Sequence, residues 1–317
     1  MGHFIQPKTI CNSGPPLDCI DVPTPAHGYG FDRLRAGYTG YATKDNFDNG
    51  NGEVDIGFGG SSPPDDYDIE SWENQCSGGE ATLRTWYDQF GSADMIQSVA
   101  SIQPMSSDGM SQGTHDMWAG GQLAISFDGV GDYMRTISTS LGQYENADCT
   151  MFALGGTASG VNYDMLMSVH IGIWPHMGTA FAHSGATTAH APTFERQQGG
   201  WQSLLGTTAN EGVYGSLATR YSHGAAVDMD MRLNDTAQGT KAVSANTNAG
   251  TRDTHIGRSG SSYGKPRIQM LLFWTERLTD AHLSELERLK TWIAGGTIAG
   301  GAGEGGEGEG EGEGGGP

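Results

Sequence analysis

Leu83–Gln89 (Leu-Arg-Thr-Trp-Tyr-Asp-Gln) and Leu123–Tyr133 (Leu-Ala-Ile-Ser-Phe-Asp-Gly-Val-Gly-Asp-Tyr) are the two stretches that decide the fold of this 317-residue chain. In each of them a strand-like run of residues ends in a turn, Asp-Gln in the first and Phe-Asp-Gly in the second. An aspartate that directly follows a strand is expected to accept hydrogen bonds from the backbone amides of its own turn. We therefore interpret Asp88 and Asp128 as signatures of the fold, and the two segments predict a β-sandwich.

Short strands recur through the rest of the chain, separated by Gly, Asn and Asp. The expected strands are Val54–Phe58, Cys149–Leu154, Met165–Trp174, Val213–Tyr221, Val227–Leu233, Lys241–Ala245, Thr254–Arg258 and Arg267–Trp274. The pairs Asn49-Gly50 and Asn51-Gly52 predict a hairpin before Val54. Regular short strands with this punctuation are typical of an all-β sandwich or jelly roll, which we expect to be one domain over residues 28–294.

A single helix is predicted, close to the C-terminus. Thr279 has the character of an N-cap, and Leu278 is placed to pack on Leu283. The apolar residues that follow fall on one face of a helix: Leu283, Leu286, Leu289, Trp292 and Ile293. We expect this helix to pack on the sandwich.

The two ends of the chain are predicted to lie outside the sandwich domain. Residues 1–27 form a Pro-rich arm without strand or helix periodicity, and residues 295–317 form a tail that is almost entirely Gly, Ala and Glu. Such a tail cannot build a core of its own. Glycine-rich strands pack side by side when several copies meet, so the tail favours a homo-oligomer.

The chain is strongly acidic, with 17 Lys and Arg against 37 Asp and Glu and a formal charge of −20. Five glutamates lie in the last fifteen residues, and −20 + 5 still leaves −15 for the remainder. A surface of this sign repels nucleic acids and anionic membranes, so neither is expected as a partner. No apolar run approaches the ~20 residues of a transmembrane helix, and the first residues do not read as a signal peptide.

The four cysteines allow two disulfides. Cys11 and Cys19 bracket a short loop rich in turn-forming residues, which predicts a bridge between them. Cys76 and Cys149 both lie near predicted strands and form a possible second pair. Zinc is the competing interpretation, but no cysteine–histidine spacing supports a metal site.

The residues that could carry chemistry are scattered. Glu195, Glu211, Asp228 and Asp230 lie in the middle region, where the carboxylate pair of a glycosidase could sit, but sequence alone assigns no catalytic residue. For glycan binding we select three aromatic residues, Trp118, Trp201 and Tyr214. The acidic segment Asp45–Asp55 leaves bound calcium as an alternative to no cofactor at all, although it fails the EF-hand spacing.

A family resemblance rests on four groups of residues. They are Arg33-Leu34-Arg35 with Tyr38-Thr39-Gly40, Asp48-Asn49 with Glu53–Phe58, Thr85–Gln89, and Phe127-Asp128-Gly129 with Asp132-Tyr133. Together they resemble the catalytic-domain fold of arabinofuranosidase B, and more closely its phage-encoded relatives, which are virion proteins. The segment Ile256–Ala281 is similar to the closing strand and helix of laminin-G and concanavalin A-like domains. The resemblance implies a concanavalin A-like jelly roll, and the Cys11–Cys19 loop is similar to a disulfide loop of that enzyme family.

The chain departs from the hydrolases of this family in two places. Those enzymes have a vicinal Cys-Cys pair in the floor of the sugar pocket, and this sequence has no adjacent cysteines. Their Asp-Gln turn usually continues Ser-Gly-Asn-Gly, whereas this chain continues Phe90-Gly91-Ser92-Ala93. We therefore predict a virion structural protein, either a capsid decoration or a tail or fibre component, located in the virion or outside the cell. Its expected partners are other virion proteins, its own copies and cell-surface glycans. The alternatives are an arabinofuranosidase-like glycoside hydrolase and a secreted carbohydrate-binding module.

Overall fold

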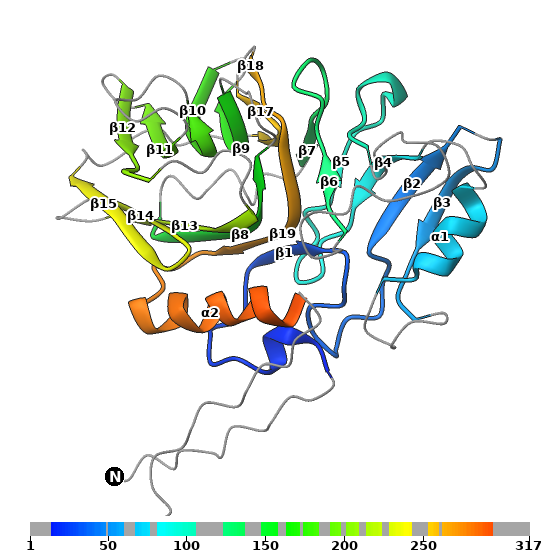
Figure 1. Ribbon diagram of the computed structural model, residues 1–317, viewed down its shortest axis with the longest axis horizontal. Helices are drawn as coiled ribbons and strands as arrows, with labels where there is room; N and C mark the ends of the chain where they lie inside the picture. Colours follow the sequence, from blue (N-terminus) through cyan, green and yellow to red (C-terminus); the bar gives the residue numbers. More distant parts are fainter. Residues whose placement is uncertain are drawn as a thin grey trace, which may run out of the picture.

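The structure is a computed structural model of the chain. It describes residues 14–48, 50–59, 67–76, 81–105, 123–136, 147–157, 163–171, 174–183, 191–197, 201–208, 214–223, 228–242, 253–259 and 262–293. Within these ranges the chain forms two large antiparallel sheets that face each other, with a long helix packed beneath one of them (Figure 1). The predicted all-β sandwich of concanavalin A-like type, with a C-terminal helix, is confirmed.

The first sheet has ten strands. In spatial order they are β12 (Trp201–Leu205), β11 (Ala191–Gln197), β10 (Trp174–His183), β9 (Tyr163–Ile171), β16 (Asp253–Ile256), β7 (Met134–Thr136), β5 (Met95–Ile96), β4 (Ala81–Trp86), β2 (Thr43–Phe47) and β3 (Gly52–Ile56). The predicted Asn-Gly hairpin is confirmed as the connection between β2 and β3, where Gly50 and Gly52 adopt positive φ angles of 93° and 73°. A short two-stranded ribbon, β17 (Arg258–Ser259) with β18 (Ser262–Tyr263), follows β16.

The second sheet has seven strands. Its order is β1 (His27–Gly30), β19 (Pro266–Trp274), β8 (Cys149–Thr157), β13 (Tyr214–Ser222), β14 (Asp228–Leu233) and β15 (Thr236–Ala242), and β6 (Ile125–Ser126) also pairs with β19. Strand β19, which corresponds to the expected strand Arg267–Trp274, is buried along its whole length except at Arg267 and has strand partners on both of its edges. Two short 3-10 turns, η1 (Pro16–Asp18) and η2 (Ala100–Ile102), lie outside the sheets.

The inner faces of the two sheets make the main core. Met134, Ile256 and Met167 of the ten-stranded sheet and Leu217, Met231 and Phe273 of the seven-stranded sheet belong to one buried cluster. Side chains of a strand alternate between its two faces, so this core fixes which residues of each strand point outward. The outward positions of the two sheets therefore provide two separate surfaces, and they differ in what covers them.

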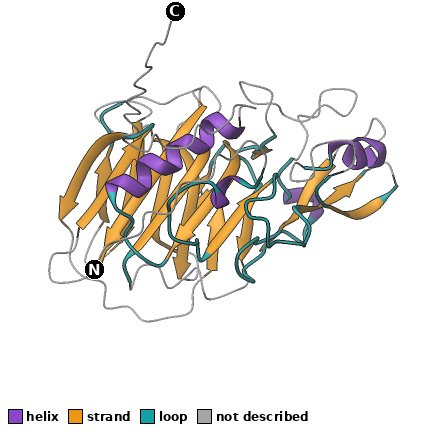
Figure 2. Ribbon diagram, turned by 90° about the horizontal axis from the view of Figure 1, so that it is seen from below, coloured by secondary structure: helices purple, strands orange, loops and turns teal. Residues whose placement is uncertain are grey.

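Helix α2 (Asp280–Ile293) covers the outer face of the seven-stranded sheet (Figures 1 and 2). Leu283, Leu286 and Leu289 are at most 2% exposed and pack with Phe152, Leu154, Leu272 and Trp274 of the sheet. The predicted N-cap is confirmed, because the amide of His282 donates to Thr279 Oγ1 at 3.2 Å. The side chains of Trp292 and Ile293 lie outside the described residues.

A second helix, α1 (Ile69–Cys76), was not expected from the sequence. It lies at the β2–β3 end of the ten-stranded sheet, where Trp72 packs against Phe47 with ring centroids 6.0 Å apart. Asp68 caps it by accepting a hydrogen bond from the amide of Ser71 at 3.0 Å. Eight residues give too short an apolar pattern to separate a helix from a loop, so the cap was the only available signal.

The Asp-Gln turn acts as predicted. Asp88 accepts hydrogen bonds from the backbone amides of Gly28, Phe90 and Ala93 at 3.0–3.1 Å, and its other contact is His27 Nδ1 at 2.6 Å. The neighbouring Gln89 side chain accepts from the amide of Leu34 at 2.8 Å. One turn thereby connects the first strand of the seven-stranded sheet to the end of β4.

The two disulfide predictions have different outcomes. Cys19 is disulfide-bonded, while its predicted partner Cys11 lies outside the described residues. The predicted Cys76–Cys149 bridge is wrong, because both residues are buried thiols. Cys76 ends α1 and Cys149 begins β8, and these two elements are well separated in Figure 1.

The described part of the N-terminal arm lies against the seven-stranded sheet. Ile20 is 7% exposed and joins the cluster beneath the helix, and Trp274 Nε1 donates to the carbonyl of Pro23 at 2.7 Å. Residues 1–13 and the Gly/Glu tail lie outside the described residues, so the predicted tail-mediated oligomer stays a prediction. Among the described helices none has the length and apolarity to cross a membrane.

Candidate functional site

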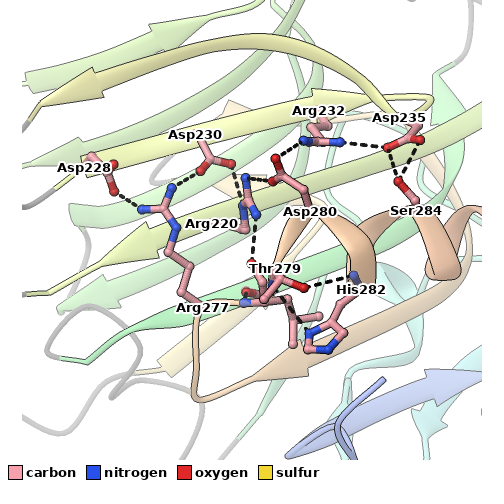
Figure 3. Close-up of polar contacts among 12 residues, drawn as sticks. Arg220, Asp228, Asp230, Arg232, Asp235, Arg277, Thr279, Asp280, His282 and Ser284 are labelled. Carbon is pink, nitrogen blue, oxygen red and sulfur yellow. Dashed lines mark hydrogen bonds and ion pairs between the residues drawn. The ribbon is translucent and has the colours of Figure 1, made fainter. Parts of the chain in front are cut away.

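Two of the four candidate catalytic carboxylates, Asp228 and Asp230, lie on β14 at the outer face of the seven-stranded sheet. Figure 3 shows that they belong to a network of alternating arginines and aspartates between this face and the start of α2. Arg220 of β13 bonds Asp230 Oδ1 at 2.8 Å through its Nε and Asp280 Oδ1 at 2.7 Å through Nη2. We call these charged residues, namely Arg220, Asp228, Asp230, Arg232, Asp235, Arg277 and Asp280, the helix clamp.

Every charge of the helix clamp has an opposite charge beside it. Arg277, just before the helix, pairs with both Asp228 and Asp230. Arg232 reaches Asp280 Oδ2 at 2.8 Å and Asp235 Oδ1 at 2.9 Å. Arg220 also donates to the carbonyl of Leu278 at 2.8 Å, and hydrogen bonds and Coulomb attraction from Arg220 and Arg232 lower the pKa of Asp280.

The helix clamp is a structural device. The side chains of Arg220 and Asp230 are only 9% and 6% exposed, so each charge is compensated by its ion-pair partners and not by water. Both carboxylate oxygens of Asp230 accept from arginines, Oδ1 from Arg220 and Oδ2 from Arg277. Asp228 and Asp230 therefore attach α2 to the sheet, and neither is a catalytic candidate in this structure.

The outer face of the ten-stranded sheet is arranged differently. The strand register places Glu195, Gly178, Ser168, His255 and Arg135 in one row across β11, β10, β9, β16 and β7. The adjacent row holds the buried core residues Met167, Ile256 and Met134. Because side chains alternate along a strand, the described side chains of this row, His255 and Arg135, lie on the outward face, and we call the row the outer row.

An aromatic and arginine cluster lies where β7, β16 and the β17–β18 ribbon meet. Arg258 is stacked over the ring of Tyr133 at 4.8 Å and over that of Tyr263 at 5.3 Å. The ring of Tyr133 lies 5.4 Å from that of His255, the buried member of the outer row. Stacking fixes the orientation of the guanidinium group between two half-buried rings.

Two carboxyl groups in the turn before Tyr133 have opposite pKa shifts. Burial would raise the pKa of Asp128, but hydrogen bonds from the amides of Gly131, Val130 and Asp132 outweigh it and lower the pKa. The pKa of Asp132 is raised to about 7 by burial and by the charge of Asp128. Asp128 is exposed, whereas Asp132 is 6% exposed.

The turn holds these two groups rigidly. Gly129 has a φ of 73°, and a Cβ at this position would lie 2.5 Å from Cγ of Lys265. Asp128 thus stays ionised at neutral pH while Asp132 exchanges its proton near pH 7. Two carboxyl groups whose environments separate their pKa values are the arrangement that acid–base catalysis of glycoside cleavage uses. We call Asp128, Asp132, Tyr133, Arg258 and Tyr263 the outer-face site.

Of the three predicted glycan-binding aromatics, only Tyr214 has a described side chain, so the predicted glycan site stays a prediction. Tyr214 lies at the interface with α2, where its hydroxyl donates to Gln269 Oε1 and its pKa is raised by burial and by Glu287. Trp201 begins β12 and pairs with Gln197, but its side chain lies outside the described residues. Trp118 also lies outside them.

The remaining predicted residues have mixed outcomes. Glu195 takes a place in the outer row on β11, and Glu211 lies outside the described residues. The acidic segment Asp45–Asp55 is the β2–β3 hairpin, in which Asp45 accepts a hydrogen bond from Thr43 Oγ1 at 2.5 Å. Within the described ranges no cluster of three or more metal-binding side chains occurs, and the calcium alternative stays a prediction.

The sequence does not reveal the outer-face site, because in the sequence its residues indicate a turn and the fold and not a binding site. Asp128 was recognised, correctly, as a turn former, and its three amide contacts confirm that role. Tyr133 was used only as part of the fold signature. The sequence feature that could have indicated the site is Asp132, the second acidic residue of the same turn. A carboxyl group close to an ionised one has a raised pKa, because the like charge disfavours its ionisation.

Comparison with known proteins supports the fold. No protein-family model and no curated protein matches the sequence. An arabinofuranosidase complexed with arabinofuranosyl-α-1,2-xylobiose superposes with a TM-score of 0.60 at 11% identity, covering 91% of this chain and 66% of that one. A GH54 α-L-arabinofuranosidase soaked with a cyclic sulfate inhibitor gives a TM-score of 0.62 at 12% identity and the same coverage. The chain thus spans about two thirds of the length of these proteins.

This finding corrects the predicted function. The sequence favoured a phage virion structural protein, a capsid decoration or a tail or fibre component. The solved structures that share the fold over 91% of the chain are arabinofuranosidases, and phage relatives of the fold are not shown. The virion prediction is wrong on this evidence, because it rested on the absence of adjacent cysteines and on a resemblance to phage relatives that the comparison does not show.

Proposed function

We propose that the protein is a glycoside hydrolase that releases L-arabinofuranose from polysaccharide, with its active site at the outer-face site. The pair Asp128 and Asp132 is the observation that carries the proposal. The pKa of Asp128 is lowered and that of Asp132 is raised to about 7, and both groups lie in the turn that leads directly into Tyr133, the ring on which Arg258 stacks. The fold shared with the arabinofuranosidases supports the substrate class, and such polysaccharides suggest that the protein acts outside the cell.

Asp132 acts as the general acid. Hydrolysis breaks the bond between the anomeric carbon and the leaving oxygen, and the proton of Asp132 goes to that oxygen. The ionised Asp128 carboxylate stabilises the positive charge that develops on the sugar ring in the transition state. Water completes the reaction by adding hydroxide to the anomeric carbon and returning a proton to Asp132.

The aromatic cluster positions the substrate. The apolar face of a sugar ring packs on an aromatic ring, and two such rings are those of Tyr133, which directly follows Asp132, and Tyr263, with centroids 6.3 Å apart. Arg258, held between the rings, provides planar N–H donors for sugar hydroxyls.

The test is hydrolysis of 4-nitrophenyl α-L-arabinofuranoside and of arabinoxylan by the full chain. Asp132→Asn keeps the shape of the side chain and removes its proton, so it is expected to lower kcat by about 10²–10⁴-fold. Glu195→Gln, on the same face but three strands from His255, is the matched carboxyl control and is expected to retain activity. Loss of activity in Glu195→Gln with full activity in Asp132→Asn would move the active site to β11 and refute our assignment of the acid.

Absence of hydrolysis by the wild-type chain would refute the proposal that the protein is a glycoside hydrolase. Retention on arabinoxylan without release of sugar would then favour the carbohydrate-binding module. The observation in favour of that second candidate is the set of half-buried tyrosines at the outer-face site.

A further inference from the structure

A second group of aromatic rings lies at the far end of the ten-stranded sheet, around the β2–β3 hairpin. Tyr41 is 51% exposed, one of three large apolar or aromatic side chains with this degree of exposure among the described residues. Its ring lies 6.3 Å from that of Tyr87, and the neighbouring rings of Tyr38 and Phe58 lie 6.1 Å apart. We call these four residues the Tyr41 platform.

The rings of the platform are held in place through their hydroxyl groups and through glycines. Tyr87 donates to Asp55 Oδ1 at 2.7 Å, and Tyr38 donates to the carbonyl of Tyr41 at 2.8 Å. A Cβ on Gly40 would lie 2.5 Å from the hydroxyl oxygen of Tyr38. The backbone therefore lets the Tyr38 ring approach closely, and burial raises the pKa of Tyr38 to about 12, so its hydroxyl remains a donor.

The platform and the outer-face site share one sheet face. The outer row continues from Arg135 through Ile96, Thr85 and Lys44 to Asp55. Asp55 holds the hydroxyl of Tyr87, and Tyr133 lies two residues from Arg135 on β7. Four strand spacings separate Asp55 from Arg135, a distance of ~19 Å.

The charges around the platform are balanced. Lys44 lies 3.5 Å from Asp55, and Arg84 is paired with Glu53. The guanidinium of Arg33 is stacked over Phe58 at 5.0 Å. A rim of paired charges offers donors and acceptors to hydroxyl groups without attracting a strongly charged partner, and the net charge of −20 repels polyanions.

We infer that the Tyr41 platform is a second binding site for a neutral polysaccharide, which stacks its sugar rings on Tyr41 and Tyr87 while the same chain extends along the sheet to the outer-face site. Aromatic faces with fixed hydroxyls and paired charges at the rim match an uncharged polyol. The identity of the polymer in this inference rests on the proposed function, whereas the existence of the binding site does not.

The experiment is affinity electrophoresis of the full chain in native gels that contain soluble arabinoxylan or arabinan. Wild-type protein is expected to be retarded. Tyr41→Ala removes the exposed ring and is expected to weaken retention by roughly three- to tenfold in apparent Kd, the contribution of one stacked aromatic pair. Tyr41→Phe keeps the ring and is the matched control, expected to bind like wild type.

Hydrolysis assays separate the platform from the active site. Tyr41→Ala is expected to leave kcat/KM on 4-nitrophenyl α-L-arabinofuranoside unchanged and to raise KM on arabinoxylan. Equal retention of Tyr41→Ala and wild type, or no retention of wild type by either polysaccharide, would overturn the platform. Retention that depends on Tyr41 in a chain without hydrolysis would support the platform while refuting the proposed enzyme.

Discussion

The helix clamp and the outer-face site lie on two surfaces of one sandwich, and both contain aspartates and arginines, although the aspartates of the outer-face site lie in a turn between two strands. In the helix clamp Asp230 is 6% exposed and contacts two arginines. In the outer-face site the charged neighbour of Asp132 is another carboxylate, that of Asp128, whose amide donates to Asp132 Oδ2 at 3.3 Å. The same residue type is thus paired with arginines in one place and lies beside a second carboxyl group in the other.

The difference between the two surfaces lies in what surrounds the carboxyl group. A carboxylate that is covered by a helix and paired with arginines has a structural role, and one without these contacts is a candidate for acid–base chemistry. Burial alone does not separate them, since Asp230 and Asp132 are both almost fully buried. The sign of the nearest charge decides the protonation state. Substitutions that remove a charged partner or a contact beneath the helix test this difference.

The largest effect is expected in the helix clamp. Asp230→Ala leaves Arg220 and Arg277 without one of their carboxylates beneath α2, and removing one partner of a buried ion pair costs about 3–5 kcal/mol of unfolding free energy. Asp228→Ala removes a more exposed carboxylate, 38% accessible, and is expected to cost less than about 1 kcal/mol. Urea unfolding measures both, and equal small losses would show that the network contributes little to stability.

Asp88 provides a further test of the comparison, because it is a strand-end aspartate whose carboxylate accepts hydrogen bonds from several backbone amides and contacts His27. Burial would raise its pKa, but His27 and the amides of Gly28 and Phe90 lower it overall. A lowered folded pKa means that Asp88 stabilises the fold above its ordinary pKa and that this stability is lost as pH falls through the folded value. Asp88→Asn is expected to cost about 1.5–3 kcal/mol at pH 7.

The pH dependence provides the control for Asp88. The difference in unfolding free energy between wild type and Asp88→Asn should shrink on going from pH 7 to pH 3. A difference that stays constant over this range would show that the carboxylate charge has no part in holding the turn.

Asp132 is expected to respond to pH in the opposite direction. Its folded pKa is raised from 3.8 to about 7, so its contribution to stability is complete below 3.8 and is lost as pH rises through about 7. Asp132→Asn should therefore be more stable than wild type at pH 8, by about 1–2 kcal/mol. In the proposed enzyme kcat/KM should fall above pH 7 as the acid loses its proton. A mutant that unfolds more easily than wild type at pH 8 would contradict the raised pKa.

Much of the fold could be predicted from local patterns, and the site could not. The Asn-Gly hairpin, the Thr279 cap and the Asp88 turn depend on residues close in sequence, and all three are confirmed. Tyr133 and Arg258, which stack on each other in the outer-face site, flank the strands β7 and β16, and these strands pair although they lie more than a hundred residues apart. Sequence spacing contains no information on such long-range register, so it could not distinguish the candidates Asp228 and Asp230 from charges that hold the helix.

Tyr214 gives the smallest expected effect and tests whether an aromatic residue beneath the helix differs from those on the open sheet. Its hydroxyl bonds Gln269 between the seven-stranded sheet and α2, so Tyr214→Phe removes one buried hydrogen bond and should cost about 1 kcal/mol of unfolding free energy. Because the ring packs with the cluster beneath the helix, retention on arabinoxylan should equal that of wild type. The same assay with Tyr133→Phe and Tyr41→Phe compares the three hydroxyls directly. If Tyr214→Phe were the only one of the three variants with weaker retention, the Tyr214 hydroxyl would be the one that contacts the sugar. Glycan binding would then lie on the helix side of the sandwich.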